Sequence, residues 1–155
     1  MAEFTHIKGD RVQMVDISEK DDVVREAVAE GRIRLKSETL DLIRQDKVEK
    51  GDPLTTAKIA GILAAKSTST IVPLCHPIPI TNIEVAVEVV KNGVVVRASV
   101  KATAKTGVEM EALTAVTASL LTVWDMVKQY EKDKDGQYPS TAIEEIHVLK
   151  KIKKS

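Results

Sequence analysis

The sequence has few aromatic residues, a single cysteine and no net charge. Aromatic side chains make up 3% of its 155 residues, so a core must be built from Val, Ile, Leu and Ala. So few aromatic residues offer little stacking surface for nucleic-acid bases. The balance of 23 basic and 23 acidic residues creates no overall field toward nucleic acid or membranes. One cysteine excludes an intrachain disulfide.

The sequence also lacks an apolar signal segment near residue 1, and no run of apolar residues approaches membrane-spanning length. We therefore expect a cytoplasmic protein. Hydrophobic content of 43% and charged content of 30% are ordinary for a globular protein. We predict a single domain over residues 1–155, mobile in part at 1–15 and 131–155, and we interpret the basic end 150–155 as solvated.

The first half of the chain is predicted to be mainly helical. Ser18 is expected to cap a helix through Glu30, with Val23, Val24, Ala27 and Val28 facing inward and Gly31 ending it. A short strand is predicted over 32–36, and a helix capped by Ser37 over 38–46. Asp52 followed by Pro53 is a helix start signal for 53–67, where small residues permit close approach of a neighbouring element: Ala57, Ala60, Gly61 and Ala64.

The second half alternates strands with one long helix. Residues 83–90 and 94–104 flank Asn92-Gly93, which predicts a hairpin whose two turn residues have positive φ. A helix is predicted over 107–132, with Thr106 and Glu109 as a capping box, followed by a strand over 141–152. The pattern predicts an α+β fold with helices on one face of a mostly antiparallel sheet.

The proline-rich segment 71-IVPLCHPIPIT-81 holds Cys75 beside His76. Three interpretations compete: a metal site, a catalytic site, or a turn before a strand. Structural zinc needs four ligands, and the other histidines lie near the two ends of the chain, so we predict no protein-bound metal. Adjacent residues of an extended peptide point to opposite sides, so we expect one of the pair at most in any pocket. His76 is the better catalytic candidate, with Cys75 packing as a small apolar residue.

Four charged residues on the long predicted helix have ordinary structural explanations. Glu109 would cap the helix, Glu111 would be a solvated acid of the first turn, and Asp125 with Lys128 would form a surface ion pair. Glu111 and Asp125 share a helix face but stand about 21 Å apart. If both ends of the helix are catalytic, each pocket combines residues from two chains.

Four segments resemble the MoaC family of molybdenum cofactor biosynthesis, the cyclic pyranopterin monophosphate synthases. They are THIKGDRVQMVDIS, KGDPLTTAKIAGILAAK, IVPLCHPIPIT and KTGVEMEALTAVTASLLTVWDMVK, within residues 5–132. The resemblance implies a ferredoxin-like α+β fold and a hexamer, a trimer of dimers, with active sites at subunit interfaces. It also implies a lyase that converts 3′,8-cyclo-7,8-dihydroguanosine triphosphate to cyclic pyranopterin monophosphate and releases pyrophosphate.

Position by position, the resemblance implies catalytic roles for Lys50, His76, Glu109, Glu111, Asp125 and Lys128. It implies substrate contacts from Arg25, Leu74, Cys75, His76, Glu109 and Met110. This reaction requires proton transfers and the stabilisation of developing phosphate charge, and residues of these types can provide both. A lysine in a cation-rich pocket would have its pKa lowered. We expect no required cofactor, and the sequence leaves assistance by Mg²⁺ open. Two alternatives stay open: an enzyme acting on another purine or pterin triphosphate, and a homo-oligomeric binding or scaffold protein.

Overall fold

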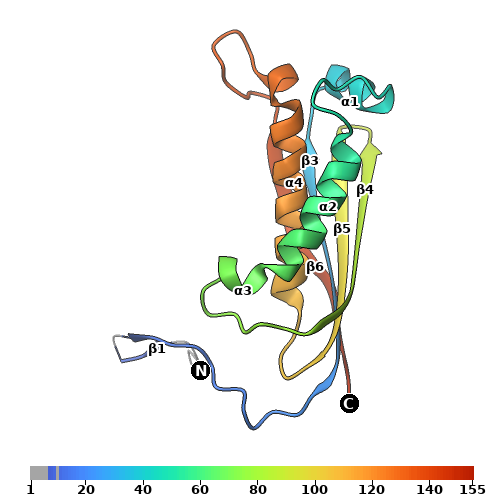
Figure 1. Ribbon diagram of the computed structural model, residues 1–155. Coiled ribbons are helices and arrows are strands. Elements are labelled where there is room, and N and C mark those ends of the chain that lie inside the picture. Colours follow the sequence, from blue (N-terminus) through green and yellow to red (C-terminus); the bar gives the residue numbers. More distant parts are fainter. Residues whose placement is uncertain (1–6, 10) are drawn as a thin grey trace.

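The computed structural model describes residues 7–9 and 11–155 (Figure 1). The predicted mobility of 1–15 falls partly on residues 1–6 and 10, which lie outside the described residues. In chain order the elements are β1 (Ile7–Lys8), β2 (Arg11–Val12), β3 (Val23–Arg34), α1 (Ser37–Arg44), α2 (Pro53–Lys66), α3 (Thr68–Ile71), β4 (Ile80–Val90), β5 (Gly93–Ala104), α4 (Glu109–Glu131) and β6 (Ala142–Lys154).

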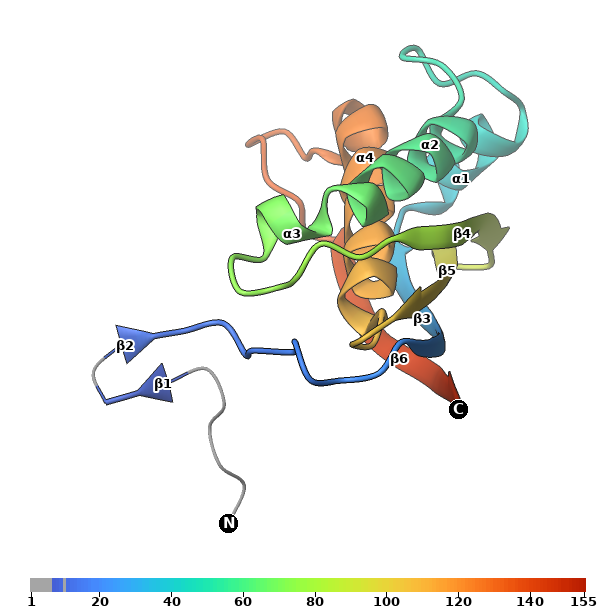
Figure 2. The ribbon, with the colours of Figure 1, turned by 60° about the horizontal axis from the view of Figure 1, so that its bottom comes forward.

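The main sheet has the strand order β4-β5-β3-β6, and every neighbouring pair is antiparallel. α4 and α2 lie side by side on one face of this sheet, while β1 and β2 form a separate ribbon away from it (Figures 1 and 2). The predicted α+β class is confirmed. The ferredoxin-like variant of it stays a prediction.

The helix predicted from Ser18 to Glu30 is wrong, because residues 23–34 form the central strand β3. Its Ala, Glu and Arg residues favour helix, but pairing with β5 over twelve positions and with β6 overrides that local preference. Ala27, Ala29 and Ile33 are fully buried in the core. The predicted short strand over 32–36 is the end of this longer strand.

Two glycines let the layers approach closely. Gly31, expected to end a helix, instead lies in β3, where a Cβ would stand 2.9 Å from side-chain atoms of Val116 and Ile146. Gly61 of α2 faces α4, and a Cβ there would stand 2.4 Å from Ser119 Oγ. Ser119 donates a hydrogen bond to the Ala57 carbonyl at 2.8 Å, which links the two helices. The predicted close approach at the small residues of α2 is confirmed.

The predicted β4–β5 hairpin is confirmed, but its turn chemistry is not. Val90 pairs with Gly93, so the loop residues are Lys91 and Asn92, and neither Asn92 nor Gly93 has a positive φ. Gly93 is needed for space instead: a Cβ would lie 1.9 Å from the carbonyl oxygen of Ile33. Glycine at this position therefore lets β5 pass the end of β3.

The helix starts agree with the sequence at α2 alone. Asp52 accepts hydrogen bonds from Leu54 N (2.9 Å) and Thr55 N (3.3 Å), as predicted. α1 begins at Ser37 itself, preceded by Lys36, and so Ser37 is not its cap. α4 begins at Glu109 after an uncapped Val108, which leaves Thr106 too far upstream for the predicted capping box.

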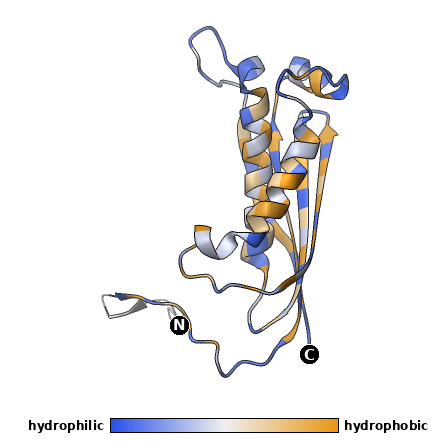
Figure 3. Ribbon diagram, in the orientation of Figure 1, coloured by the Kyte–Doolittle hydropathy of each residue, from blue (hydrophilic) through white to orange (hydrophobic). Residues whose placement is uncertain are grey.

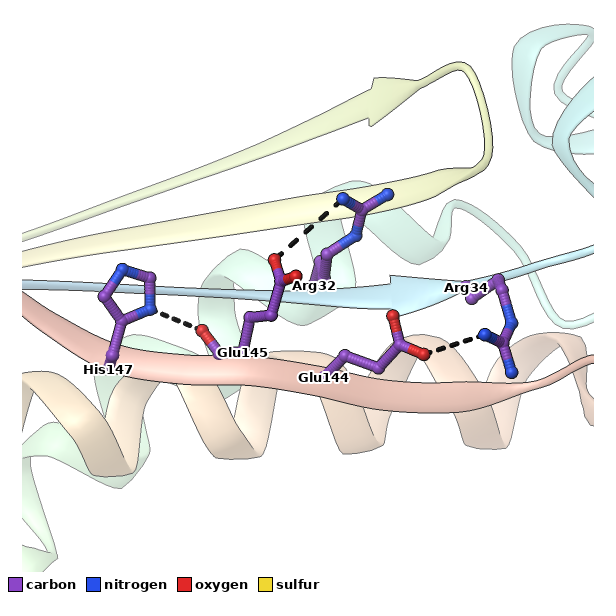
Figure 4. Close-up of polar contacts among 5 residues, drawn as sticks. All are labelled: Arg32, Arg34, Glu144, Glu145 and His147. Carbon is purple, nitrogen blue, oxygen red and sulfur yellow. Dashed lines mark hydrogen bonds and ion pairs between the residues drawn. The ribbon is translucent and has the colours of Figure 1, made fainter.

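The predicted last strand is confirmed as β6, which continues through the lysine-rich end to Lys154. Its register slips at Glu145, which has a φ of 58°, because two β6 residues there oppose one β3 residue. Cross-strand pairs surround the slip (Figure 4): Arg34 Nη1 lies 2.9 Å from Glu144 Oε1, and Arg32 Nη1 lies 4.0 Å from Glu145 Oε2.

Apolar residues concentrate between the sheet and the helices, with further apolar positions on the outer surface of α2 (Figure 3). Among the described residues, α4 is the one helix whose length and hydropathy alone would allow it to cross a membrane, contrary to the expectation that no run approaches that length. Half of that window is buried, as in a core helix.

Candidate functional site

α4 carries the predicted ionisable residues at its two ends. Glu109 and Glu111 lie in its first turn, and Asp125 and Lys128 lie near its last turn. The fourteen residues from Glu111 to Asp125 correspond to a rise of about 21 Å. Each end is joined by a segment from elsewhere in the chain: the proline-rich segment at the first, and the α1–α2 loop at the second.

The first end opens into a cavity of about 310 Å³. Its lining comes from the N-terminal segment, the proline-rich segment and the start of α4: Val15, Ile17, Lys20, Leu74, Cys75, His76, Ile78, Thr106, Gly107, Glu109, Met110 and Glu111. Cys75 and His76 both line it, so the expectation that one at most would face a pocket is wrong. The alternation rule fails because Cys75 N bonds Val72 O (3.1 Å) in a turn rather than in an extended strand.

Glu111 is the most perturbed carboxylate in this cavity. It is 4% exposed, which contradicts the predicted solvated role, and its Oε2 accepts no hydrogen bond from the described residues. The pKa of Glu111 is raised to about 7: burial is the largest cause, the hydrogen bond from its own backbone opposes it, and the charge of the nearby Glu109 adds to the rise. At neutral pH this carboxyl is therefore divided between its protonated and ionised forms.

Glu109 has the opposite balance although it is two residues away. Partial burial is the largest single effect and acts to raise its pKa, but a hydrogen bond from Lys151, its own backbone and the charges of Lys151 and Arg25 together lower it. Lys151 Nζ lies 2.8 Å from Glu109 Oε1. The basic end of the chain was predicted to be solvated, and this contact places one of its lysines at the site.

Cys75 is half-buried, and burial followed by the charge of Glu111 raises the pKa of its thiol. A thiol held protonated is a poor nucleophile and a poor metal ligand. Within the described residues no group of three His, Cys, Asp or Glu side chains is arranged to hold a metal ion.

The second end carries a three-residue ionic cluster on the surface. Lys128 Nζ lies 3.0 Å from Asp125 Oδ1, and Lys50 Nζ lies 3.3 Å from Asp125 Oδ2 and 3.1 Å from the Asp125 carbonyl oxygen. Hydrogen bonds from Lys128 and then from Lys50 lower the pKa of Asp125, while the same contact with Asp125 raises the pKa of Lys128. The expected lowering of a lysine pKa is therefore wrong for Lys128, because a carboxylate stands beside it.

Arg25 does not line the cavity of the first group, although its charge acts on Glu109. Its side chain borders a separate cavity of about 390 Å³ together with Lys20 and Lys153, and its Nη2 lies 3.4 Å from the Lys105 carbonyl oxygen. Lys20 also lines the cavity that holds Glu111, so it connects the two spaces. Sequence reasoning missed Lys20 and Lys151. For Lys151 the available signal was the strand predicted over 141–152, which already placed this lysine in the sheet.

The structure thus brings together His76, Glu109 and Glu111 in one group, and Lys50, Asp125 and Lys128 in another, without joining the groups. The fold and these groups define an α+β protein whose candidate site residues form two clusters of ionisable groups, one at each end of a core helix.

Comparison with known proteins identifies the family. Residues 14–154 match the MoaC family. A relative from Methanococcoides burtonii is 56% identical over 100% of this chain and 98% of its own length. Others from Thermococcus onnurineus (53%; 99% and 98%) and Saccharolobus solfataricus (55%; 91% and 95%) are similar. All three are named probable cyclic pyranopterin monophosphate synthases. The chain belongs to the MoaC family.

Proposed function

We propose that this protein is a cyclic pyranopterin monophosphate synthase of molybdenum cofactor biosynthesis. It converts 3′,8-cyclo-7,8-dihydroguanosine triphosphate to cyclic pyranopterin monophosphate and pyrophosphate, as a phosphorus–oxygen lyase acting in the cytoplasm. The observation that carries the proposal is 56% identity, over the full chain, to a relative of that name. The clustered ionisable groups of this chain supply chemistry that such a reaction needs.

The reaction needs groups that exchange protons and groups that offset phosphate charge. Glu111, with a pKa of about 7, can give and accept a proton near neutral pH, and His76 lies in the same cavity. To form the cyclic phosphate, a substrate hydroxyl gives its proton to a base and attacks the α-phosphorus, so that a new P–O bond forms while the bond to the leaving pyrophosphate breaks. Lys50 and Lys128 are cations that can stabilise that charge, with Asp125 holding both.

The remaining family positions fit substrate contacts. Leu74, Cys75 and Met110 line the cavity beside Glu111. Arg25 borders the adjoining space and presents a guanidinium whose Nε is buried without a partner among the described residues. A guanidinium suits a phosphate group. The proposed reaction needs no bound cofactor, and the assay tests whether Mg²⁺ assists it.

The divided site favours an assembly in which each pocket takes one helix end from each of two chains, as in a hexamer made of three dimers. The support is the separation of the two groups along α4 and the apolar side chains exposed on the outer surface. Ile59 and Leu63 of α2 are 54% and 58% exposed, and Leu121 of α4 is 56% exposed. Large exposed apolar side chains that lie near one another mark association surfaces.

The proposal is tested by incubating the protein with the cyclised substrate, with and without MgCl₂, and measuring pyrophosphate and the pterin product. Lys128→Ala serves as the matched inactive variant, and GTP as the control substrate. We expect the parent protein to form product from the cyclised substrate and none from GTP. Binding of the cyclised substrate without turnover would favour the scaffold or binding-protein alternative. Turnover of a different purine triphosphate would identify another enzyme on this fold.

A further inference from the structure

Lys50 lies in the loop between α1 and α2, where the nearby Val48 is held against the core. Val48 is 7% exposed, and Gly51 N bonds the Val48 carbonyl oxygen at 3.1 Å, which closes a tight turn around Lys50. Gly51 has a φ of 115°, a conformation that other residues rarely adopt. The backbone at Lys50 is therefore shaped by a turn, while its long side chain is 46% exposed.

The turn is tied to the last turn of α4 through Glu49. Tyr130 Oη accepts a hydrogen bond from Glu49 N at 2.9 Å, directly before Lys50 in the chain. Gln129 Nε2 donates to Glu49 Oε2 at 3.1 Å, which is a second link but one between exposed side chains. Lys50 itself then reaches back to Asp125, one turn earlier on the same helix.

Tyr130 is a firm point of attachment. Its ring packs against the core. The next residue, Glu131, is fully buried, and its carboxylate accepts hydrogen bonds from the Thr39 hydroxyl, from Thr141 Oγ1 (2.6 Å) and from Lys36 N (3.2 Å). A carboxylate with several donors fixes the backbone around it. The last turn of α4 is thus anchored to the start of α1 and to the chain entering β6.

We propose that Tyr130 is a positioning residue for Lys50: its hydroxyl holds the Glu49 amide and so keeps Lys50 Nζ beside Asp125. The inference rests on the proposed function, because it assigns Lys50 a part in the reaction. A lysine with four rotatable side-chain bonds loses much freedom when it is held, and a fixed backbone before it reduces the number of positions that its Nζ samples. Small displacements of a catalytic group lower turnover strongly.

The test compares Tyr130→Phe, which keeps the ring and removes the acceptor, with Gln129→Ala, which removes the side-chain link to the same glutamate. Steady-state kcat and KM are measured with the cyclised substrate, and thermal unfolding confirms that each variant folds. Hydrogen exchange is followed by mass spectrometry in the peptide spanning 45–53. We expect Tyr130→Phe to lower kcat about tenfold, with KM changed less than about twofold, because Lys50 is misplaced rather than lost.

The exchange experiment supplies a readout independent of turnover. Tyr130→Phe should raise the exchange of one amide in that peptide, that of Glu49, whereas Gln129→Ala should leave exchange and kcat within about twofold of the parent. An active parent whose kcat survives Tyr130→Phe within twofold would overturn the positioning role, as would unchanged exchange. If the parent protein has no activity with the cyclised substrate, the proposed function is refuted instead. The exchange result still decides whether Tyr130 holds the loop.

Discussion

At the N-terminal end of α4, Glu111 is buried and one of its oxygens has no hydrogen-bond donor among residues 7–9 and 11–155, whereas at the C-terminal end Asp125 is exposed between two lysines. Burial raises the pKa of Glu111 to about 7, and the hydrogen bonds from Lys128 and Lys50 lower the pKa of Asp125. The same functional group therefore carries a mobile proton at one end and a fixed negative charge at the other. Surroundings, rather than residue type, set the role of each carboxylate.

The largest expected effect comes from inactivating one end of α4 in one set of chains and the other end in a second set. Lys50→Ala and Glu111→Gln should each lower turnover about 10²-fold or more with the fold intact. A mixture of the two after subunit exchange should regain roughly a quarter of parent activity, because random pairing places the two intact ends together in that share of sites. The measurement is turnover after verified exchange.

The matched control mixes Lys50→Ala with Asp125→Ala. These residues contact each other within one chain, so this mixture should stay inactive. Recovery in the control and none in the first mixture would contradict the assembly proposed here.

The second effect concerns stability and pH. The folded pKa of Glu111 is raised from its ordinary 4.5 to about 7, so the folded state binds the proton more tightly than the unfolded state. Its ionisation therefore destabilises the fold as pH rises from about 4.5 to about 7, by at most about 3.4 kcal/mol at about 1.36 kcal/mol per pH unit. Glu111→Gln should remove this loss. Urea unfolding at pH 5 and pH 8 checks it: the variant should gain on the parent only at pH 8, and an equal difference at both pH values would refute the assignment.

A smaller effect is expected from replacing Cys75 at the first end. The thiol of Cys75 has a raised pKa and lines the cavity without a role as a nucleophile, so Cys75→Ser should keep turnover within about threefold of the parent. His76→Ala, beside it, should lose most activity. Kinetic assays of both variants, with metal analysis of the parent, check this. Zinc bound stoichiometrically to the parent and lost in Cys75→Ser would reverse the interpretation.

The smallest effect is expected at the exposed end. Asp125→Asn removes both ion pairs, yet exposed pairs contribute little to stability, so the midpoint of thermal unfolding should shift by less than about 2 °C. Calorimetry of this variant beside Glu111→Gln at pH 8 compares the two ends directly. A loss of several degrees in Asp125→Asn would show that the cluster is structural.

The sequence predicted elements that are bounded by local signals. Asp52 and Pro53 marked the start of α2, and the alternation on both sides of Asn92 marked the hairpin. β3 was missed because its residues favour helix, and its strand state depends on two partners that are distant in the chain. The role of Gly93 was misread for a related reason: the close carbonyl belongs to Ile33, sixty residues earlier in the sequence.

The site was predictable in membership but not in environment. Motif resemblance named His76, Glu109, Glu111, Asp125 and Lys128, and their separation followed from helix geometry. The burial of Glu111 depends on the proline-rich segment and the N-terminal segment closing over the start of α4, which no spacing along one helix reveals. Lys151 reaches Glu109 from the last strand, and its role required the strand register.

One continuous helix carries both ends of the site, and this restricts how the chain can change in length. An insertion or deletion of a single residue between 112 and 124 would turn one end relative to the other by about 100° and shift it by about 1.5 Å. Either Glu111 or Asp125 would then leave its partners, although each short motif would be intact in the sequence. The number of residues in this stretch is thus as strongly constrained as the identity of the residues at its ends. A homologue with an altered spacing should have lost the activity while retaining every motif.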